Sequence, residues 1–400
     1  MFFAGIDWAD DHHDVVVLDP QGELVNQFRV QHSVSGLRRL VDQLKLVAGP
    51  VETACIIETR HGILVNHLLE SGFAVFPVNP KTVDRHRSPS RAKTDMIDAG
   101  ILARHGLHEL DRLRRLKPDS PVIQELKLLT RDQAALIRQQ TRLVNQLIAC
   151  LKDYYPLALQ IFSKLNQPIT LAFLQAFPTL DHLSQAGPSN LAAFFKGHRY
   201  PRPNQTTQKI LLLLQEPQLR SNQFVTRAKA RLMLAIVAQL APLGDAIRAY
   251  DTEIERLFLA HSDSTLLQSL PGAGKRLAPR LLAEWGDERN RYASHESVAA
   301  LAGTSPVPFQ SGRIVRARKR SACIKSFRDV LYKLAWLSTQ CEPWAADYYS
   351  LKRMEGKSHS EAVRSLSNTW VRIIHAMWIR RQPYCREVFL TAQARHRRPA

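Results

Sequence analysis

The sequence lacks the features of a disulfide-bonded, zinc-binding or membrane-spanning protein. Its five cysteines are scattered, odd in number and without a CxxC pair, which argues against a zinc site or a disulfide framework. No stretch approaches the roughly 20 apolar residues of a membrane span. The N-terminus has neither the basic segment nor the cleavage pattern of a signal peptide. We therefore expect a cytoplasmic protein that does not use a membrane.

Acidic residues are scarce relative to basic ones. The 400 residues include 55 Lys and Arg but only 36 Asp and Glu, which gives a net charge of +19. Such an excess usually indicates a polyanionic partner such as nucleic acid, and the alternative is a merely basic, soluble surface. The hydrophobic content of 45% is ample for packed cores, and the length suggests two or three domains.

Short apolar runs and helical patterns alternate in the N-terminal part of the chain. Residues 2–7, 14–19 and 24–30 read as three strands linked by turns. A helix over 35–47, a strand over 53–57, a helix over about 63–71 and a strand over 73–78 follow. Three hairpin-linked strands followed by alternating helix and strand are the order of the ribonuclease H-like fold.

Four carboxylates stand where such a fold would bring them together. Asp7 and Glu58 each end an apolar strand; if strands one and four are parallel neighbours, both leave the sheet at the same edge. Asp95 and Asp98 lie three apart, on one face of a following helix. Hard Mg²⁺ ions prefer such oxygen ligands and are spaced about 3.5–4 Å apart in two-metal sites. The sequence predicts a magnesium-dependent phosphoryl-transfer site for two Mg²⁺ ions, in which Mn²⁺ can substitute.

Other polar residues near Asp7 have simpler interpretations. We expect Asp10, Asp11 and Asp14 to be turn residues, because only Asp7 directly ends the buried run. No HExxH or similar metal-ligand spacing occurs among the histidines. The pair His12-His13 is therefore expected at the start of a strand rather than on a metal.

Two long helices are predicted in the middle of the chain. The first spans 121–155, and the second carries a four-three apolar repeat over 236–257, which is typical of a coiled-coil seam. An ordinary helical bundle core fits the same pattern equally well. Pro242 and Gly244 interrupt the second repeat, so we expect a kink or break there. Residues 156–224 are rich in proline and read as a helical insert.

A glycine-rich turn precedes a predicted apolar helix over 277–285. It contains Gly272, Gly274 and Lys275 but not the glycine and Ser/Thr positions of a Walker P-loop. A Pro-Gly-x-Gly turn between helices resembles a helix-hairpin-helix, in which backbone N–H groups at a helix N-terminus contact phosphate. A plain connection between two helices is an equally good interpretation.

Ser311 and a run of basic residues follow in what reads as a loop. A serine beside a glycine is ordinarily only a turn residue, but guanidinium groups here could bind a scissile phosphate. Ser311 is therefore a candidate nucleophile, and Ser305, Ser321 and Ser326 are weaker candidates. The residues expected to contact nucleic acid are Lys93, Gly272, Gly274, Lys275, Arg313, Arg316, Arg318, Lys319 and Arg320.

The sequence as a whole resembles the DEDD-type insertion-sequence transposases of the IS-one-ten family, which includes Piv-type DNA invertases. The resemblance spans nearly the whole chain. It rests on several ordered motifs: Gly5-Ile6-Asp7, Ile57-Glu58, Asn79-Pro80, Lys93-Thr94-Asp95 with Asp98-Ala99, Leu270-Pro271-Gly272 with Gly274, Ala302-Gly303 with Pro306, and Ser311-Gly312.

The resemblance implies an α/β ribonuclease H-like (RuvC-like) domain over 1–118, long helices or a coiled coil over 119–262, a mainly α transposase domain over 263–388 and a basic tail over 389–400. In that family Mg²⁺ is bound by carboxylates matching Asp7, Glu58, Asp95 and Asp98. A serine matching Ser311 forms a covalent phosphoserine link to DNA. The resemblance also implies that the partners are donor and target DNA and, in some family members, a bridge RNA encoded by the element. It further implies a homo-oligomer (dimer or tetramer) in which the serine of one subunit meets the carboxylates of another.

Two other functions are compatible with parts of this pattern. A RuvC-like endonuclease or junction resolvase would need the four carboxylates but would use water in place of Ser311. A non-catalytic nucleic-acid-binding protein would need only the basic surface. A DNA recombinase that mobilises an insertion sequence accounts for both sets of residues.

Overall fold

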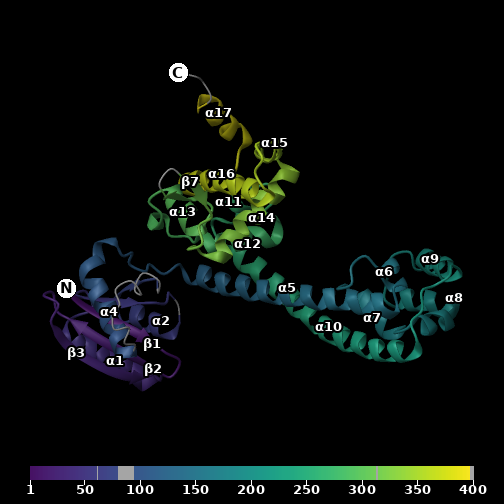
Figure 1. Cartoon of the computed structure of the whole chain (residues 1–400), viewed down its shortest axis with the longest axis horizontal. Helices are drawn as coiled ribbons and strands as arrows, with labels where there is room; N and C mark the ends of the chain where they lie inside the picture. Colours follow the sequence, from purple (N-terminus) through teal and green to yellow (C-terminus); the bar gives the residue numbers. More distant parts are fainter. Residues whose placement is uncertain (61, 80–93, 312–313, 397–400) are drawn as a thin grey trace. The chain divides into compact units, whose positions relative to one another are not determined.

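The computed structural model describes residues 1–60, 62–79, 94–311 and 314–396. The chain divides into two compact units, Met1–Pro118 and Asp119–Ala400 (Figure 1). Two of the predicted nucleic-acid contacts, Lys93 and Arg313, lie outside the described residues.

A five-stranded mixed sheet forms the centre of the first unit, with the strand order β3-β2-β1-β4-β5. β1 and β2, and β2 and β3, pair antiparallel, while β4 pairs parallel with β1 and with β5. The predicted parallel pairing of the first and fourth strands is therefore confirmed. The strands are β1 (Phe2–Trp8), β2 (His12–Leu18), β3 (Leu24–Gln31), β4 (Thr53–Ile57) and β5 (Ala74–Pro77).

Helices cover both faces of this sheet. α1 (Val34–Val47) and α2 (Ile63–Glu70) share a core with Ala4 and Ile6 of β1 on one face. α4 (Asp95–Glu109), followed by the short η2 (Leu110–Arg112), packs on the other face, where Phe3 of β1 is buried. Successive side chains of a strand alternate between faces, so Asp7 points to the same face as Phe3, toward α4.

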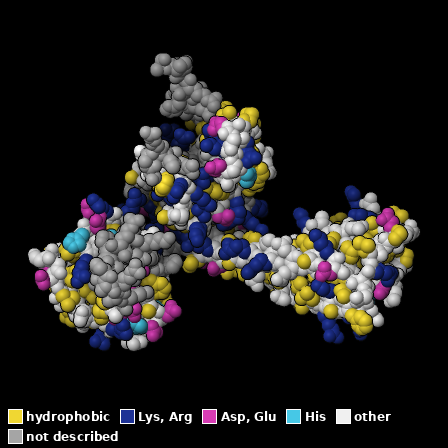
Figure 2. Space-filling view, in the orientation of Figure 1, with side chains coloured by type: hydrophobic (Ala, Val, Ile, Leu, Met, Phe, Trp, Pro, Cys, Tyr) yellow, Lys and Arg dark blue, Asp and Glu magenta, His cyan; other side chains and the backbone are white. Residues whose placement is uncertain are grey.

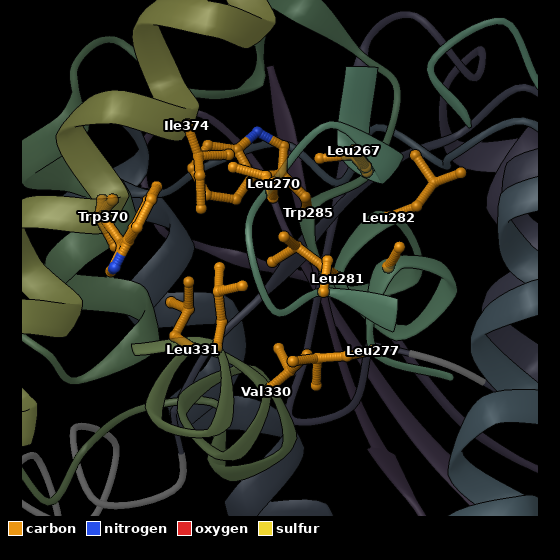
Figure 3. Packing of buried hydrophobic residues seen from close by; sticks show 14 of the residues in the cluster. Leu267, Leu270, Leu277, Leu281, Leu282, Trp285, Val330, Leu331, Trp370 and Ile374 are labelled. Atoms are coloured by element: carbon orange, nitrogen blue, oxygen red, sulfur yellow. The ribbon is translucent and has the colours of Figure 1, made fainter. Parts of the chain in front are cut away.

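A helical bundle with a large aromatic core forms part of the second unit. Trp285, Trp370 and Trp378 are fully buried and pack among leucines from several helices, and Figure 3 shows Trp285 and Trp370 with their neighbours Leu281 and Leu331. The helices are α11 (Ser264–Gln268), α12 (Gly274–Trp285), η3 (Arg289–Arg291), α13 (His295–Ala302), α14 (Lys325–Cys341), α15 (Pro343–Met354), α16 (His359–Arg380) and α17 (Arg386–His396).

Two long helices, α5 (Pro121–Tyr154) and α10 (Gln223–Ala260), run side by side from this bundle and form an arm (Figure 1). They are antiparallel: Gln133 bonds to Asp251 at 2.8 Å, and Asp153 near the other end bonds to Lys229 at 2.6 Å. The apolar seam predicted for the second helix is thus used within the chain, against α5. α10 continues through Pro242, so the expected break is absent.

The far end of the arm carries a small helical tip. It consists of α6 (Leu157–Ile161), α7 (Pro168–Ala176), α8 (Leu180–Gly197) and α9 (Pro203–Gln215). Gly187, with φ of +71°, produces a kink inside α8. The tip and the outer half of the arm share one hydrophobic core, which includes Leu147, Phe173 and Met233.

A polar waist separates that core from the core of the bundle. Among the fully buried residues of α5, Leu126 is the last in the bundle core and Leu143 the first in the outer core. Leu129 packs partly buried against the bundle core, and Ile247 of α10 is buried between the two cores. Between them Gln133 is buried and donates its hydrogen bond to Asp251, which also pairs with Arg276 of α12.

Two further features of the second unit differ from the sequence-based expectation. A β-hairpin, β6 (Val307–Ser311) and β7 (Ile314–Arg318), occupies a segment that we expected to be a loop. α17 extends to His396, so the segment expected to be a tail from residue 389 is helical up to that point.

One helix among the described residues, α10, is long and apolar enough to cross a membrane by length and composition. This finding qualifies the expectation that no segment could do so. The core helices of soluble proteins pass the same test, and most of the buried side chains of α10 belong to the two cores described above.

Candidate catalytic carboxylate site

A row of charged residues crosses the sheet on the face covered by α4. Arg29 of β3 pairs with Asp14 of β2, and Asp14 pairs with Asp7 of β1. The β1–β4 ladder is in register to Ile6 and Ile57, so Glu58 follows as the neighbour of Asp7. Paired residues point to the same face of a sheet. Two of the four predicted carboxylates therefore end neighbouring parallel strands.

α4 brings the other two carboxylates to this row. Asp95 and Asp98 lie in its first turn, and Thr94 caps the helix by accepting a hydrogen bond from the backbone N–H of Ile97 at 3.2 Å. Carboxylates are favoured in the first turn because the N-terminal end of the helix dipole is positive.

Gly5 permits the close approach of α4 to β1. A Cβ at this position would lie 2.0 Å from the carbonyl oxygen of Ala99 and 2.3 Å from the backbone nitrogen of Ala103. Only a residue without a side chain fits there. The glycine two residues before Asp7 thus fixes how near the first turn of α4 comes to the sheet.

The raised pKa of Asp7 reflects its burial and the nearness of the other carboxylates. Its pKa is raised to about 6, first by burial and then by neighbouring negative charges. Those charges belong to Asp98, Asp95, Glu58 and Asp14, in decreasing order of effect. Like charges gathered at one place disfavour ionisation, so the site holds more negative charge than water and the protein readily stabilise.

Asp14 is not the turn residue expected from the sequence. It lies within β2 and is completely buried. Arg29 donates from Nε to Asp14 Oδ1 at 2.9 Å and from Nη2 to Oδ2 at 2.6 Å. A bidentate guanidinium–carboxylate pair of this kind compensates a buried charge. Sequence reasoning missed both residues, because the pairing is visible only once the register of β2 and β3 is known.

His12 begins β2, as predicted, but it also adjoins the carboxylates. Its Nε2 lies 3.3 Å from Asp95 Oδ2, and one ligand atom each from His12, Asp14 and Asp95 lies within 4.8 Å of the others. Both oxygens of Asp14 also accept hydrogen bonds from Arg29, and each keeps a second lone pair, so these three residues could hold a metal ion. The carboxylates around Asp7 also fit a divalent cation, since a cation would offset the negative charges that, after burial, raise the pKa of Asp7.

The turn predicted to contact phosphate lies between α11 and α12 in the second unit. Gly272, with φ of +80°, packs against α14, and a Cβ there would lie 3.0 Å from Leu337. The close approach to α14 is a structural reason for glycine at position 272. Gly274 and Lys275 are exposed at the start of α12, and Lys275 Nζ donates to Glu255 at 3.0 Å.

Ser311 is the last residue of β6, paired with Ile314 of β7. The basic run accompanies this hairpin: the backbone of Arg316 and Arg318 lies in β7, and Lys319 and Arg320 follow. The guanidinium carbon of Arg318 lies 3.5 Å from the ring centre of Phe309, a cation–π contact. In β7, Val315 and Ala317 alternate with Arg316 and Arg318, which was the signal available for a strand.

Comparisons with known proteins match both units. A transposase family profile of the DEDD type matches residues 4–156, and that of the transposase IS116/IS110/IS902 family matches residues 264–350. The IS117 mini-circle protein of Streptomyces coelicolor is 31% identical over 93% of this chain and 92% of its own length. A 42 kDa protein of insertion element IS900 from Mycobacterium paratuberculosis is 28% identical over 94% of this chain and 95% of its own. The chain therefore belongs to the IS110 family of transposases and is a DNA-binding, DNA-processing enzyme.

Proposed function

We propose that the chain cuts and rejoins DNA to mobilise an insertion sequence, through a ribonuclease H-like (RuvC-like) domain whose Asp7, Glu58, Asp95 and Asp98 hold divalent metal. The observation that carries this proposal is the convergence of carboxylates on Asp7, whose pKa rises to about 6. The strand order of the sheet, with β1 between β2 and β4, supports the assignment of the fold.

The four carboxylates would hold Mg²⁺, or Mn²⁺ in its place, because hard cations prefer oxygen ligands. When bound, the metal supplies positive charge that stabilises the transition state of phosphoryl transfer. The protein side chains contribute the placement: Asp7 and Glu58 from a rigid sheet, and Asp95 and Asp98 from a capped helix turn. Sites built on regular elements hold their groups more precisely than sites on loops.

Ser311 acts as the nucleophile in this proposal. Its Oγ–H loses a proton as Oγ bonds to the DNA phosphorus, the P–O bond to the leaving deoxyribose oxygen breaks, and that oxygen takes up a proton. The phosphoserine link retains the bond energy, and the hydroxyl of another strand end reverses the step to rejoin DNA. Two observations support this role: Ser311 ends β6, and the cations Arg318, Lys319 and Arg320 stand at the end of β7 and directly after it.

The partners that follow from this function are donor and target DNA, with a bridge RNA encoded by the element as guide and a homo-oligomer as the active form. The cytoplasm, at the nucleoid, is the corresponding compartment. The net charge of +19 supports binding to polyanions of this kind.

A DNA fragment that carries the element's ends, incubated with the full-length protein and Mg²⁺, tests the proposal. We expect a covalent protein–DNA adduct from the wild type and none from Ser311→Ala. Asp98→Asn should cut roughly 10³-fold more slowly, corresponding to several kcal/mol of lost metal-dependent stabilisation. Arg38→Gln, on the opposite face of the sheet, is the control. Activity recovered on mixing the Ser311→Ala and Asp98→Asn proteins would assign the two groups to different subunits.

The water-dependent nuclease remains the second candidate, because all four carboxylates come from the unit Met1–Pro118. Ser311→Ala separates the two functions. Cutting at the wild-type rate without an adduct would establish hydrolysis and exclude the serine mechanism.

A further inference from the structure

The side chains of His12 and Arg29 both approach one oxygen of Asp95. Neither residue is among the four metal ligands of the proposed function. His12 Nε2 lies 3.3 Å from Asp95 Oδ2, and Arg29 Nη2 lies 3.8 Å from the same oxygen. Both come from the sheet, His12 from β2 and Arg29 from β3, whereas Asp95 comes from α4. The contacts therefore tie the first turn of the helix to strands on the side away from Glu58.

Each of these two side chains is itself held in place. Arg29 donates hydrogen bonds from Nε and Nη2 to Asp14, which is completely buried. These bonds fix the guanidinium plane with Nη2 3.8 Å from Asp95 Oδ2. His12 Nδ1 lies 2.7 Å from Asp11 Oδ1, which orients the imidazole ring. A partner that is rigid before it meets its target loses little conformational freedom in the contact.

We propose that Arg29 and His12 are positioning residues for Asp95, one of the metal ligands under the proposed function on which this inference rests. By contacting Oδ2 they fix the rotation of the carboxylate, so that Oδ1 is the oxygen turned to a metal. Arg29 also places a positive charge beside Asp14 and Asp95, which lowers the mutual repulsion of the carboxylates before metal binds. Side chains that orient metal ligands change metal affinity by about 10- to 100-fold when mutated.

Arg29 could instead contact a DNA phosphate, since its side chain is 52% exposed. The two roles make different demands. A positioning residue acts on metal binding in the absence of DNA, whereas a phosphate contact acts on DNA binding in the absence of metal.

Two measurements on the full-length protein test the assignment: Mn²⁺ binding without DNA, followed by electron paramagnetic resonance, and DNA binding without metal, followed by fluorescence anisotropy. We expect His12→Ala and Arg29→Lys each to weaken Mn²⁺ binding by about 10-fold and to leave DNA affinity within about twofold of the wild type. Cutting by both variants should recover at high Mg²⁺. His12→Gln, which keeps a donor near the position of Nε2, should restore most of the affinity for Mn²⁺.

Removal of the guanidinium leaves the buried Asp14 uncompensated, so the test of Arg29 needs a variant that folds. The double variant Asp14→Asn/Arg29→Gln replaces the ion pair by two amides that can hydrogen-bond to each other. It should weaken Mn²⁺ binding at least as much as Arg29→Lys. Arg38→Gln on α1 is the matched control and should change neither measurement.

Other outcomes are equally decisive. Loss of DNA affinity with unchanged Mn²⁺ binding would make Arg29 a phosphate contact and overturn the proposal. Unchanged Mn²⁺ binding in all His12 and Arg29 variants would also overturn it, while the proposed function stands as long as Asp98→Asn abolishes Mn²⁺ binding. If the wild type itself bound no Mn²⁺, the metal site of the proposed function would be wrong.

Discussion

The sheet edge around Asp7 and the arm formed by α5 and α10 carry opposite charges. The sheet edge gathers carboxylates at one place, whereas the arm and its tip carry many basic side chains. At the sheet edge five carboxylates influence one another, and Arg29 is shared between Asp14 and Asp95. Residues 133–244, which form most of the arm and its tip, contain twelve Lys and Arg but only three Asp and Glu. This region accounts for +9 of the net charge of +19.

The acidic residues of the arm and tip are largely used by ion pairs. Asp153 pairs with Lys229 and Asp181 with Arg220, each at 2.6 Å. Exposed basic side chains such as Arg138 and Arg142, one helical turn apart on α5, remain available to a polyanion, and Figure 2 shows Lys and Arg side chains along the arm and around the tip. The net charge of the sequence thus conceals a separation: one region gathers anions suited to a metal, and another presents cations suited to DNA.

The largest expected effect comes from forcing α4 away from the carboxylate row. Gly5→Ala places a Cβ 2.0 Å from the carbonyl oxygen of Ala99, so we expect about 3 kcal/mol of destabilisation and loss of Mn²⁺ binding. Urea unfolding and calorimetry would measure both. Gly100→Ala on α4 is the matched control, because its Cβ would meet nothing within 4 Å and alanine favours helix by about 0.5–1 kcal/mol. Equal stability of the two variants would contradict the close packing.

Asp7→Asn should stabilise the metal-free protein. The pKa of Asp7 is raised from 3.8 to about 6, so ionised Asp7 costs folding free energy, and stability falls as the pH rises from about 4 to 6. The variant should remove this pH dependence and gain about 1 kcal/mol at pH 7.5, a value reduced because Asp7 is only partly buried and solvent screens its charge. Thermal unfolding with and without Mg²⁺ measures it; stabilisation of the variant by Mg²⁺ equal to that of the wild type would contradict the assignment of Asp7.

Neutralising the arm should lower the salt dependence of DNA binding. Arg138→Gln/Arg142→Gln removes two cations, so the slope of log K against log salt should fall by about 2. Anisotropy titrations at several salt concentrations measure the slope. Arg256→Gln is the control, since Arg256 already pairs with Glu253 on α10. An equal change in slope for both proteins would show that the arm is not the binding surface.

The smallest expected effect concerns the ion pair at the outer end of the arm. Asp153→Ala releases Lys229 and removes an acidic residue, so DNA affinity should rise about twofold. Because the pair is exposed, the free energy of unfolding should change by less than about 1 kcal/mol. A fall in DNA affinity would indicate that the pair orders the arm rather than masking a cation.

The sequence predicted elements whose pattern is local. Apolar runs ending at Asp7 and Glu58 located β1 and β4, and the pairing of these strands followed from their order. The role of Gly5 and the Asp14–Arg29 pair could not be predicted, because both depend on which residues face each other across strands and across a helix. At Pro242 a local signal was misleading. The residue is exposed on α10, and packing against α5 maintains a helix that local propensity would interrupt.

The polar waist of the arm has a mechanical consequence. Hydrophobic cores pack the arm on both sides of Gln133. Between them no α5 residue is a fully buried member of either core, and Pro242 and Gly244 lie in the facing part of α10. Proline removes a backbone hydrogen bond from the helix. Bending stiffness should therefore be lowest at this joint. The tip and the outer half of the arm share one core. They would therefore move together as one rigid body when a bound partner bends the arm.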